Sequence, residues 1–192
     1  MKNGLFAGSG NHRIIPAVRK AEDLQKACDS EWPMIFLLIG DLFTVKQYVR
    51  QGLEAGKKVF LHVDFIGGLG SDPLVVKYIA EKIGPTGIIS TKNHMVKQAK
   101  KSGLLAIQRL FLIDTSALEH GINNVRQNES DALEVMPGLI PRVITELSSS
   151  TSRPIIAGGL IKDHQEIEAA LQAGASAVSM GNPELWHSFA QA

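Results

Sequence analysis

The sequence has little of several features that mark specialised classes of protein. Cys28 is the single cysteine among 192 residues, which excludes an intrachain disulfide framework and suits a reducing compartment. The net charge of +1 gives no global attraction to nucleic acid or membrane. No apolar run approaches the ~18 residues of a membrane span, and the first residues lack a signal peptide. We therefore expect a cytoplasmic protein.

Motifs for metal binding and for the common nucleotide sites are also absent. The six histidines are scattered without the spacing of a zinc site. The sequence has no Walker loop, no Gly-x-Gly-x-x-Gly fingerprint and no Gly-x-Ser-x-Gly nucleophile elbow. We therefore predict no metal and no cofactor, and any function must depend on other polar residues.

Short apolar segments alternate with amphipathic segments along the whole chain. Continuous apolar segments are typical of strands in a parallel sheet that is covered on both faces. Strands are expected at Arg13–Val18, Met34–Ile39, Lys58–Asp64, Gly87–Ser90, Leu104–Leu110, Ala132–Met136, Pro154–Ala157 and Ala177–Met180. Eight such units favour a compact α/β fold, the (β/α)8 TIM barrel, in a single domain over residues 1–192. A doubly wound open sheet is the alternative, but five or six strands would be more usual there.

The expected helices have recognisable ends. Asp72 before Pro73 fits an N-cap followed by a first-turn proline, and Asp163 with Glu166 three residues later fits a capping box. A glycine stands where a helix should stop before three of the expected strands, at Gly56, Gly103 and Gly174.

Two glycine-bearing turns follow the seventh and eighth expected strands. They contain Gly158-Gly159 and Gly181-Asn182. Such turns leave backbone N–H groups free for an anion, and the loops after strands seven and eight of a TIM barrel frequently hold phosphate. We therefore predict that Gly158, Gly159, Gly181 and Asn182 bind the phosphate of a ligand. The alternative is that the glycines only permit tight turns and that Asn182 only caps a helix beginning at Pro183.

Polar residues gather at the carboxyl ends of the expected strands, where TIM barrels carry function. They are Asp41, His62, Asp64, Lys92, Arg109, Asp114, Glu134, Ser179 and Asn182. His62 and Asp64 alternate, so both can point into the barrel mouth. For Asp64, a ligand contact and a loop-ordering role stand equally open. His62 is expected to be a buried histidine whose hydrogen bonds are satisfied.

Four charged residues of this set are predicted to bind the polyol part of a ligand and balance its charge: Asp64, Lys92, Arg109 and Glu134. Lys92 could neutralise a ligand phosphate or form a Schiff base. Arg109 lies within an apolar run, where an unpaired guanidinium is very costly, so it needs an acidic partner or a ligand anion. Glu134 could pair with Arg109 or Lys92, or accept hydrogen bonds from a hydroxyl group.

One local feature departs from the overall balance of charge. No acidic residue occurs between Glu81 and Asp114, a window that holds six basic residues. Lys97, Lys100 and Lys101 are expected on or near one exposed helix face, where they could contact RNA phosphates. Such a run is more often a solvated face, and no RNA-binding module signature accompanies it.

Stretches spread over nearly the whole chain match, in order, those of a known family. They are Ile14–Val18, Phe36–Asp41, Val59–Ile66, Gly87–Lys92, Gln108–Asp114, Glu134–Gly138, Pro154–Ile161 and Leu185-Trp186. Together they resemble the glycerol-3-phosphate-responsive antiterminators of bacteria (glycerol uptake operon antiterminator regulatory proteins). The resemblance implies a small TIM barrel that binds glycerol 3-phosphate as its effector. It also implies action on leader mRNA of glycerol-utilisation genes, where it prevents premature transcription termination.

A second class of function remains open from the residues alone. The TIM barrel hosts many chemistries, so an enzyme acting on a small phosphorylated substrate is the rival reading, as a lyase, isomerase or transferase. Asp64, Lys92 and Glu134 would then serve as general acid, electrophile and base. A purely structural barrel would leave the charges at the strand ends unexplained. The sequence leaves the oligomeric state open, a homo-oligomer included.

Overall fold

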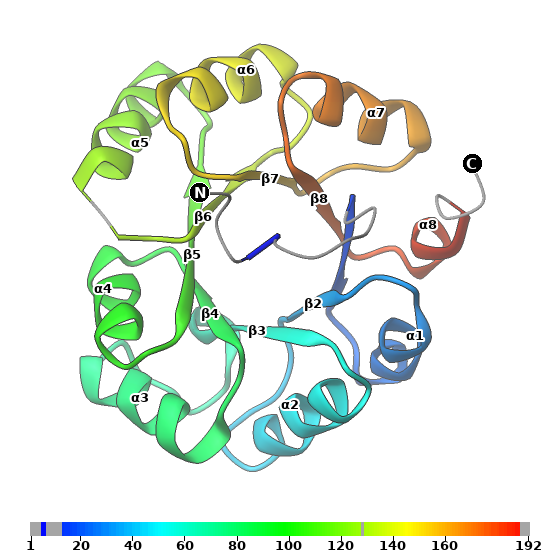
Figure 1. The fold of residues 1–192 in the computed structure, drawn as a ribbon, viewed down its shortest axis with the longest axis vertical. Helices are drawn as coiled ribbons and strands as arrows, with labels where there is room; N and C mark the ends of the chain where they lie inside the picture. Colours follow the sequence, from blue (N-terminus) through cyan, green and yellow to red (C-terminus); the bar gives the residue numbers. More distant parts are fainter. Residues whose placement is uncertain (1–4, 7–12, 128, 189–192) are drawn as a thin grey trace.

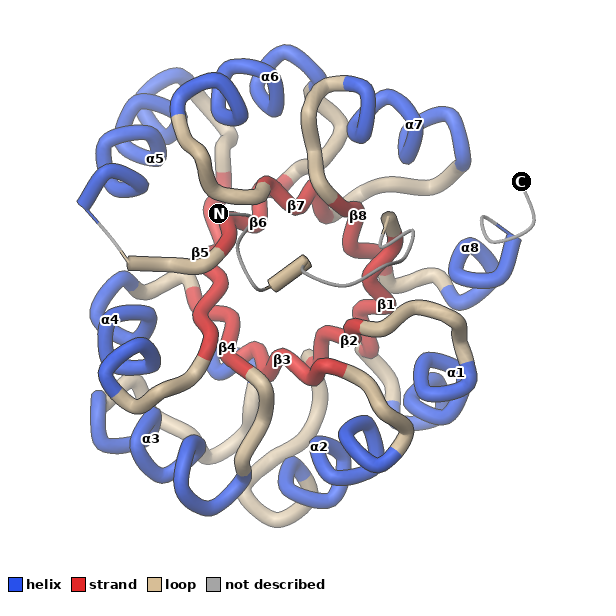
Figure 2. The backbone as a smooth tube through the Cα atoms, viewed as in Figure 1, coloured by secondary structure: helices blue, strands red, loops and turns tan. Residues whose placement is uncertain are grey.

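Eight parallel strands close into a barrel in the order of the chain, with the helices around the outside (Figure 1; Figure 2). The structure is a computed structural model that describes residues 5–6, 13–127 and 129–188. The predicted (β/α)8 TIM barrel is therefore confirmed, while both ends of the predicted domain 1–192 lie outside the described residues.

The observed strands agree with the expected ones to within about two residues at each end. They are β1 (Ile14–Val18), β2 (Met34–Leu37), β3 (Lys58–His62), β4 (Gly87–Ser90), β5 (Leu105–Phe111), β6 (Ala132–Met136), β7 (Ile155–Gly158) and β8 (Ala177–Met180). The third strand is shorter than predicted. It ends at His62, and Asp64 lies in a 3-10 turn, Val63–Phe65.

The helix ends that were predicted from the sequence are those observed in the structure. The helices are α1 (Leu24–Asp29), α2 (Val45–Glu54), α3 (Pro73–Tyr78), α4 (Asn93–Lys101), α5 (Thr115–Gln127), α6 (Pro141–Ser150), α7 (His164–Gln172) and α8 (Pro183–Ser188). Asp72 caps α3 by accepting from the Leu74 amide, and Asp163 caps α7 by accepting from the Glu166 amide. The glycines after α2, α4 and α7 have left-handed backbone conformations, as expected for helix stops.

The barrel interior is filled by alternate residues of the strands. One buried cluster contains Ile15, Ala17, Met34, Phe36, Phe60, Ile89, Ile107, Ala132, Ile156 and Ala177. Leu5 joins this cluster and packs at the amino end of the barrel. Because strand side chains alternate, the residue two positions beyond each of these also points inward, nearer the carboxyl end. On β3, β5, β6 and β8 the apolar interior therefore stops one layer below the barrel mouth, whereas Leu38 continues it beyond β2.

Candidate functional site

The layer above the apolar interior is polar. It consists of His62 on β3, Arg109 on β5, Glu134 on β6 and Ser179 on β8, which are called the polar floor below. Each of the four residues is at most 3% exposed. Polar side chains at such depth are stable only with hydrogen-bonding partners, so the partners of each residue indicate what the layer can do.

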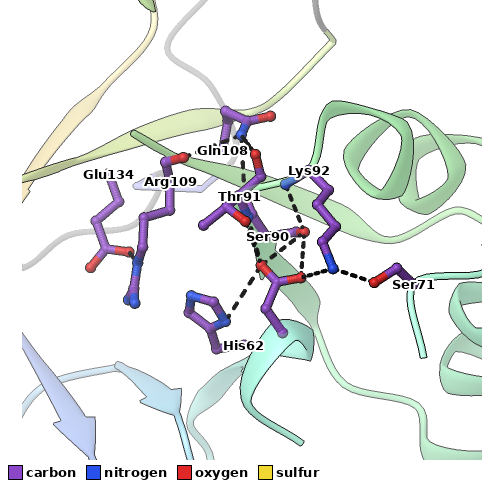
Figure 3. Close-up of polar contacts among 9 residues, drawn as sticks. His62, Ser71, Ser90, Thr91, Lys92, Gln108, Arg109 and Glu134 are labelled. Atoms are coloured by element: carbon purple, nitrogen blue, oxygen red, sulfur yellow. Dashed lines mark hydrogen bonds and ion pairs between the residues drawn. The ribbon is translucent and has the colours of Figure 1, made fainter. Parts of the chain in front are cut away.

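Glu134 connects two other residues of the polar floor, because it accepts hydrogen bonds from both. The Arg109 Nε donates to Glu134 Oε2 over 2.7 Å (Figure 3). The Ser179 hydroxyl donates to Glu134 Oε1 over 2.7 Å. Arg109 and Glu134 are directly opposite each other on neighbouring strands. A Cβ atom on Gly158 would lie 2.4 Å from the Ser179 hydroxyl, so only glycine fits beside this group. Of the two partners expected for Arg109, an acidic residue or a ligand anion, the structure shows the acidic residue.

Asp64 organises the other side of the mouth, between the loops after β3 and β4. Its carboxylate accepts hydrogen bonds from the Ser90 hydroxyl, from the Thr91 amide at 2.7 Å and from the Thr91 hydroxyl at 3.0 Å. The Lys92 ammonium lies 3.8 Å from Asp64 and also donates to the Ser71 hydroxyl (Figure 3). Asp64 therefore orders the loop, and Lys92 balances its charge.

His62 departs from the expectation of satisfied hydrogen bonds. Within the described part of the chain, neither ring nitrogen has a hydrogen-bond partner, although the side chain is fully buried. Burial, followed by the positive charge of Arg109, lowers the pKa of His62 from 6.5 to about 3, while Asp64 acts in the opposite direction. The imidazole is neutral at pH 7, so its 4.0 Å approach to Asp64 is not an ion pair. The ring of Phe65 covers His62 edge-on.

The two glycine turns lie side by side, because β7 and β8 are neighbours and Gly158 is opposite Ser179. Gly159 and Leu160 both have positive φ angles, +77° and +64°. Leucine rarely adopts this conformation, which is the kind of local strain that gathers at binding sites. Among the described residues, the amides of Gly159, Leu160 and Gly181 donate no hydrogen bond. These turns can therefore offer N–H groups to an anion.

Three other polar residues at strand ends have local structural roles. The Asn182 side chain accepts from the Glu184 amide and caps α8, as the alternative interpretation of this residue stated. Asp41 accepts from the amides of Phe43 and Thr44, and Asp114 accepts from an amide in the first turn of α5. For Asn182, the capping bond occupies the side-chain Oδ1, so only its side-chain NH2 and its backbone can serve a ligand.

Arg19 is a residue that the sequence reasoning missed. It follows β1 with the same inward parity as Ile15 and Ala17, so the criterion applied to the other strand ends would have included it. Its side chain is exposed, and a Cβ atom on Gly181 would lie 3.2 Å from the Arg19 Cδ. The Arg19 stem thus lies directly over the second glycine turn.

The lysines of α4 do not form one uniform surface. Lys97 and Lys101 are exposed, as expected. Lys100 is instead bound by both carboxylate oxygens of Asp131 at 2.7 Å and is half-buried, so its assignment to an open RNA-binding face is wrong. The Lys100–Asp131 pair ties α4 to the start of β6, and Asp131 also accepts from the Ala106 amide of β5. This pair could not be inferred from the local lysine pattern.

The described residues contain no group of three or more His, Cys, Asp and Glu side chains placed to hold a metal ion. Within the same residues, no helix has both the length and the apolar character needed to cross a membrane.

Comparisons with known proteins agree with the resemblance noted in the sequence. The model of a family described as glycerol-3-phosphate responsive antiterminator matches residues 14–186. The uncharacterized protein YgcP of Escherichia coli strain K12 is 35% identical over 173 residues, which cover 90% of this chain and 91% of that protein.

Solved structures show the same relationship. The glycerol uptake operon antiterminator regulatory protein of Listeria monocytogenes strain 4b F2365 has a TM-score of 0.88 at 34% identity, covering 92% of this chain and 96% of that chain. A glycerol uptake operon antiterminator-related protein of Thermotoga maritima has a TM-score of 0.81 at 31% identity, covering 91% and 97%. A deoxyribose phosphate aldolase of Aeropyrum pernix, with a TM-score of 0.71 but 18% identity, covers 93% and 90% and shares the fold alone. The chain therefore belongs to the glycerol-3-phosphate responsive antiterminator family.

Proposed function

We propose that the protein is a transcription antiterminator that binds glycerol 3-phosphate at the barrel mouth and leader mRNA of glycerol-utilisation genes on its surface. Family membership supports the effector and the process. The observation that carries the proposal is the division of the mouth into two parts. Glycine turns whose amides donate to no other described residue lie on one side, and charge-balanced carboxylates lie on the other.

The two parts fit the two ends of glycerol 3-phosphate. The phosphate binds the backbone amides at the glycine turns, as helix and loop amides bind phosphate in many barrels. The hydroxyl groups hydrogen-bond to Asp64 and Glu134, whose charges Lys92 and Arg109 already neutralise. The unpaired nitrogens of His62 supply further donors or acceptors for a hydroxyl at the same level.

The hydrogen bonds at the mouth favour binding over catalysis. A general acid or base works best when its pKa lies near the operating pH. The pKa of His62 is about 3, far from that range. Asp64 already accepts from three groups of the loop, and Glu134 is held by Arg109 and Ser179. These carboxylates are committed to fixed partners, which suits a rigid receptor better than a proton-transfer centre.

The link to RNA runs through α4. Lys92 is the N-cap of this helix, and Lys97 and Lys101 are exposed further along it. A ligand that draws Lys92 toward its phosphate or hydroxyls would shift the start of α4. Coupling of this kind between two sites is typically worth ~1–3 kcal/mol. In this proposal, Lys97 and Lys101 contact RNA phosphates, and Lys100 keeps the helix in place through Asp131.

The test is calorimetric titration of the protein with glycerol 3-phosphate, followed by a search for any product after long incubation. Saturable binding without turnover supports the regulator. Conversion of glycerol 3-phosphate to a product would favour the rival function, an enzyme. Absence of binding would contradict both the regulator and the enzyme.

Two variants test the division of the mouth. Asp64→Asn and Glu134→Gln should each lower the affinity for glycerol 3-phosphate roughly tenfold to a hundredfold, since a charged hydrogen bond contributes ~1.5–3 kcal/mol. Inorganic phosphate does not reach the hydroxyl part, so its affinity should change much less. Equal weakening of both ligands would contradict the division.

A further inference from the structure

Arg19 stands apart from the other arginines whose side chains the structure describes. Arg13, Arg50, Arg109 and Arg142 each lie within 3.7 Å of a glutamate oxygen, and Arg153 also has a partner. Arg19 faces no carboxylate and makes no hydrogen bond within the described residues. A guanidinium presents five N–H donors in a planar fork that matches a phosphate, so this arrangement leaves its whole binding capacity unused.

The position of Arg19 joins it to the glycine turns. The strands β7, β8 and β1 are consecutive neighbours in the closed barrel. Pro16 on β1 is opposite Met180 on β8, one residue before Gly181. The Arg19 stem lies over Gly181, where a side chain would press on its Cδ at 3.2 Å. Gly181 therefore gives the arginine room to lie along the edge of the turn.

Two further observations indicate a ligand at this end of the barrel. His62 is fully buried, and neither of its ring nitrogens has a partner among the described residues. Such unpaired groups are rare in native proteins and ask for an explanation. In addition, Leu160 has a φ angle of +64° immediately after Gly159, and neither amide donates a hydrogen bond to another described residue.

We propose that Arg19 binds the phosphate group of a phosphomonoester held at these turns. Its fork closes over the anion from the β1 side, while the amides of Gly159, Leu160 and Gly181 bind it from below. The site thus combines two kinds of donor, the charged guanidinium of Arg19 and the neutral backbone amides. A charge-assisted hydrogen bond from the guanidinium is stronger than one from an amide, so the site favours a doubly charged phosphate. The inference rests on the proposed function only for the identity of the ligand.

The experiment compares Arg19→Met with the parent and with a matched control, Arg13→Met, at the residue before β1. Methionine keeps an unbranched apolar stem over Gly181 and removes the fork, so the packing is largely retained. Arg13 lies at the opposite end of β1 and pairs with Glu168. Affinities for glycerol 3-phosphate and for inorganic phosphate are measured by calorimetry, and thermal stability is measured without ligand.

Arg19→Met should lower the affinity for both ligands roughly tenfold to a hundredfold and leave the melting temperature unchanged. Arg13→Met should lower the affinity for neither ligand. Unchanged affinity for both ligands, or weakening of glycerol 3-phosphate alone, would overturn the proposal. A loss of leader-RNA affinity with both small ligands unaffected would also overturn it, because Arg19 would then belong to the RNA surface.

The same measurements separate this inference from the proposed function. A parent protein that binds inorganic phosphate in an Arg19-dependent way, but not glycerol 3-phosphate, would support Arg19 and contradict the proposed effector. A parent that binds neither ligand would contradict both.

Discussion

The buried ion pair of the polar floor should be far more sensitive to substitution than a surface pair of the same length. Replacing Arg109 by methionine removes the guanidinium that lies 2.7 Å from Glu134 and leaves that carboxylate without its charged partner at 0% exposure. Breaking a buried pair in this way typically costs ~3–5 kcal/mol, because the remaining charge has lost both water and counter-ion. The whole stability of a domain is only about 5–15 kcal/mol, so the loss should be large and measurable.

The chain offers a matched control on α2. Arg50 Nε and Glu54 Oε1 are also 2.7 Å apart, but their side chains are 77% and 63% exposed. Exposed pairs contribute about 0–1 kcal/mol, since water screens the attraction. Arg50→Met should therefore cost at most about 1 kcal/mol. The comparison holds the distance constant and changes only the burial.

Urea unfolding at neutral pH without ligand measures both effects. The buried residues Trp32 and Trp186 report the transition by fluorescence. The double variant Arg109→Met with Glu134→Gln leaves no charge buried and should recover most of the stability lost in Arg109→Met. Equal costs for the Arg109 and Arg50 substitutions would show that burial does not strengthen the dependence on the ion pair. A double variant that is no more stable than Arg109→Met would show that the unpaired Glu134 charge is not the cause of the loss.

Three further predictions concern the rest of the mouth and α4. Gly159→Val should lower the folding stability by about 1–2 kcal/mol, because valine must adopt the left-handed backbone of Gly159. Gly159→Val and Gly181→Val should both weaken the binding of glycerol 3-phosphate. If both variants fold and bind like the parent, the phosphate lies elsewhere. The free energy of unfolding should fall by about 1.4 kcal/mol between about pH 7.5 and pH 5.5. The reason is that His62 has a pKa of 6.5 in the unfolded chain and takes up a proton there, whereas its pKa in the folded chain is lowered to about 3. His62→Gln should lack this loss, and an identical pH profile would contradict the assignment. Replacing Lys97 and Lys101 by glutamine should weaken the binding of leader RNA and reduce the dependence of log affinity on log salt concentration by about 1.4. Replacing Lys26 on α1 and Lys46 on α2 by glutamine is the control and should change neither quantity. No change in the Lys97 and Lys101 variant would remove α4 from the RNA surface.

Much of the architecture was predictable because it depends on local pattern. Continuous apolar segments, helix caps such as Asp72 and glycine stops such as Gly103 act over a few residues, so the eight units could be counted along the chain. The pairing of Arg109 also followed from its surroundings, since a guanidinium within an apolar run needs an anion. Only the sequence pattern was needed to state that requirement.

The barrel, the glycine turns and the need for charge balance at the strand ends follow from the order of the amino acids alone. Which groups meet depends on the folded arrangement. Folding pairs Lys100 with Asp131, buries His62 without a hydrogen-bond partner among the described residues, and brings Arg19 over Gly181 from the opposite end of the chain. Such contacts depend on barrel closure and strand register, which bring distant residues together, and desolvation then sets their charge and hydrogen bonding. No local pattern carries that information.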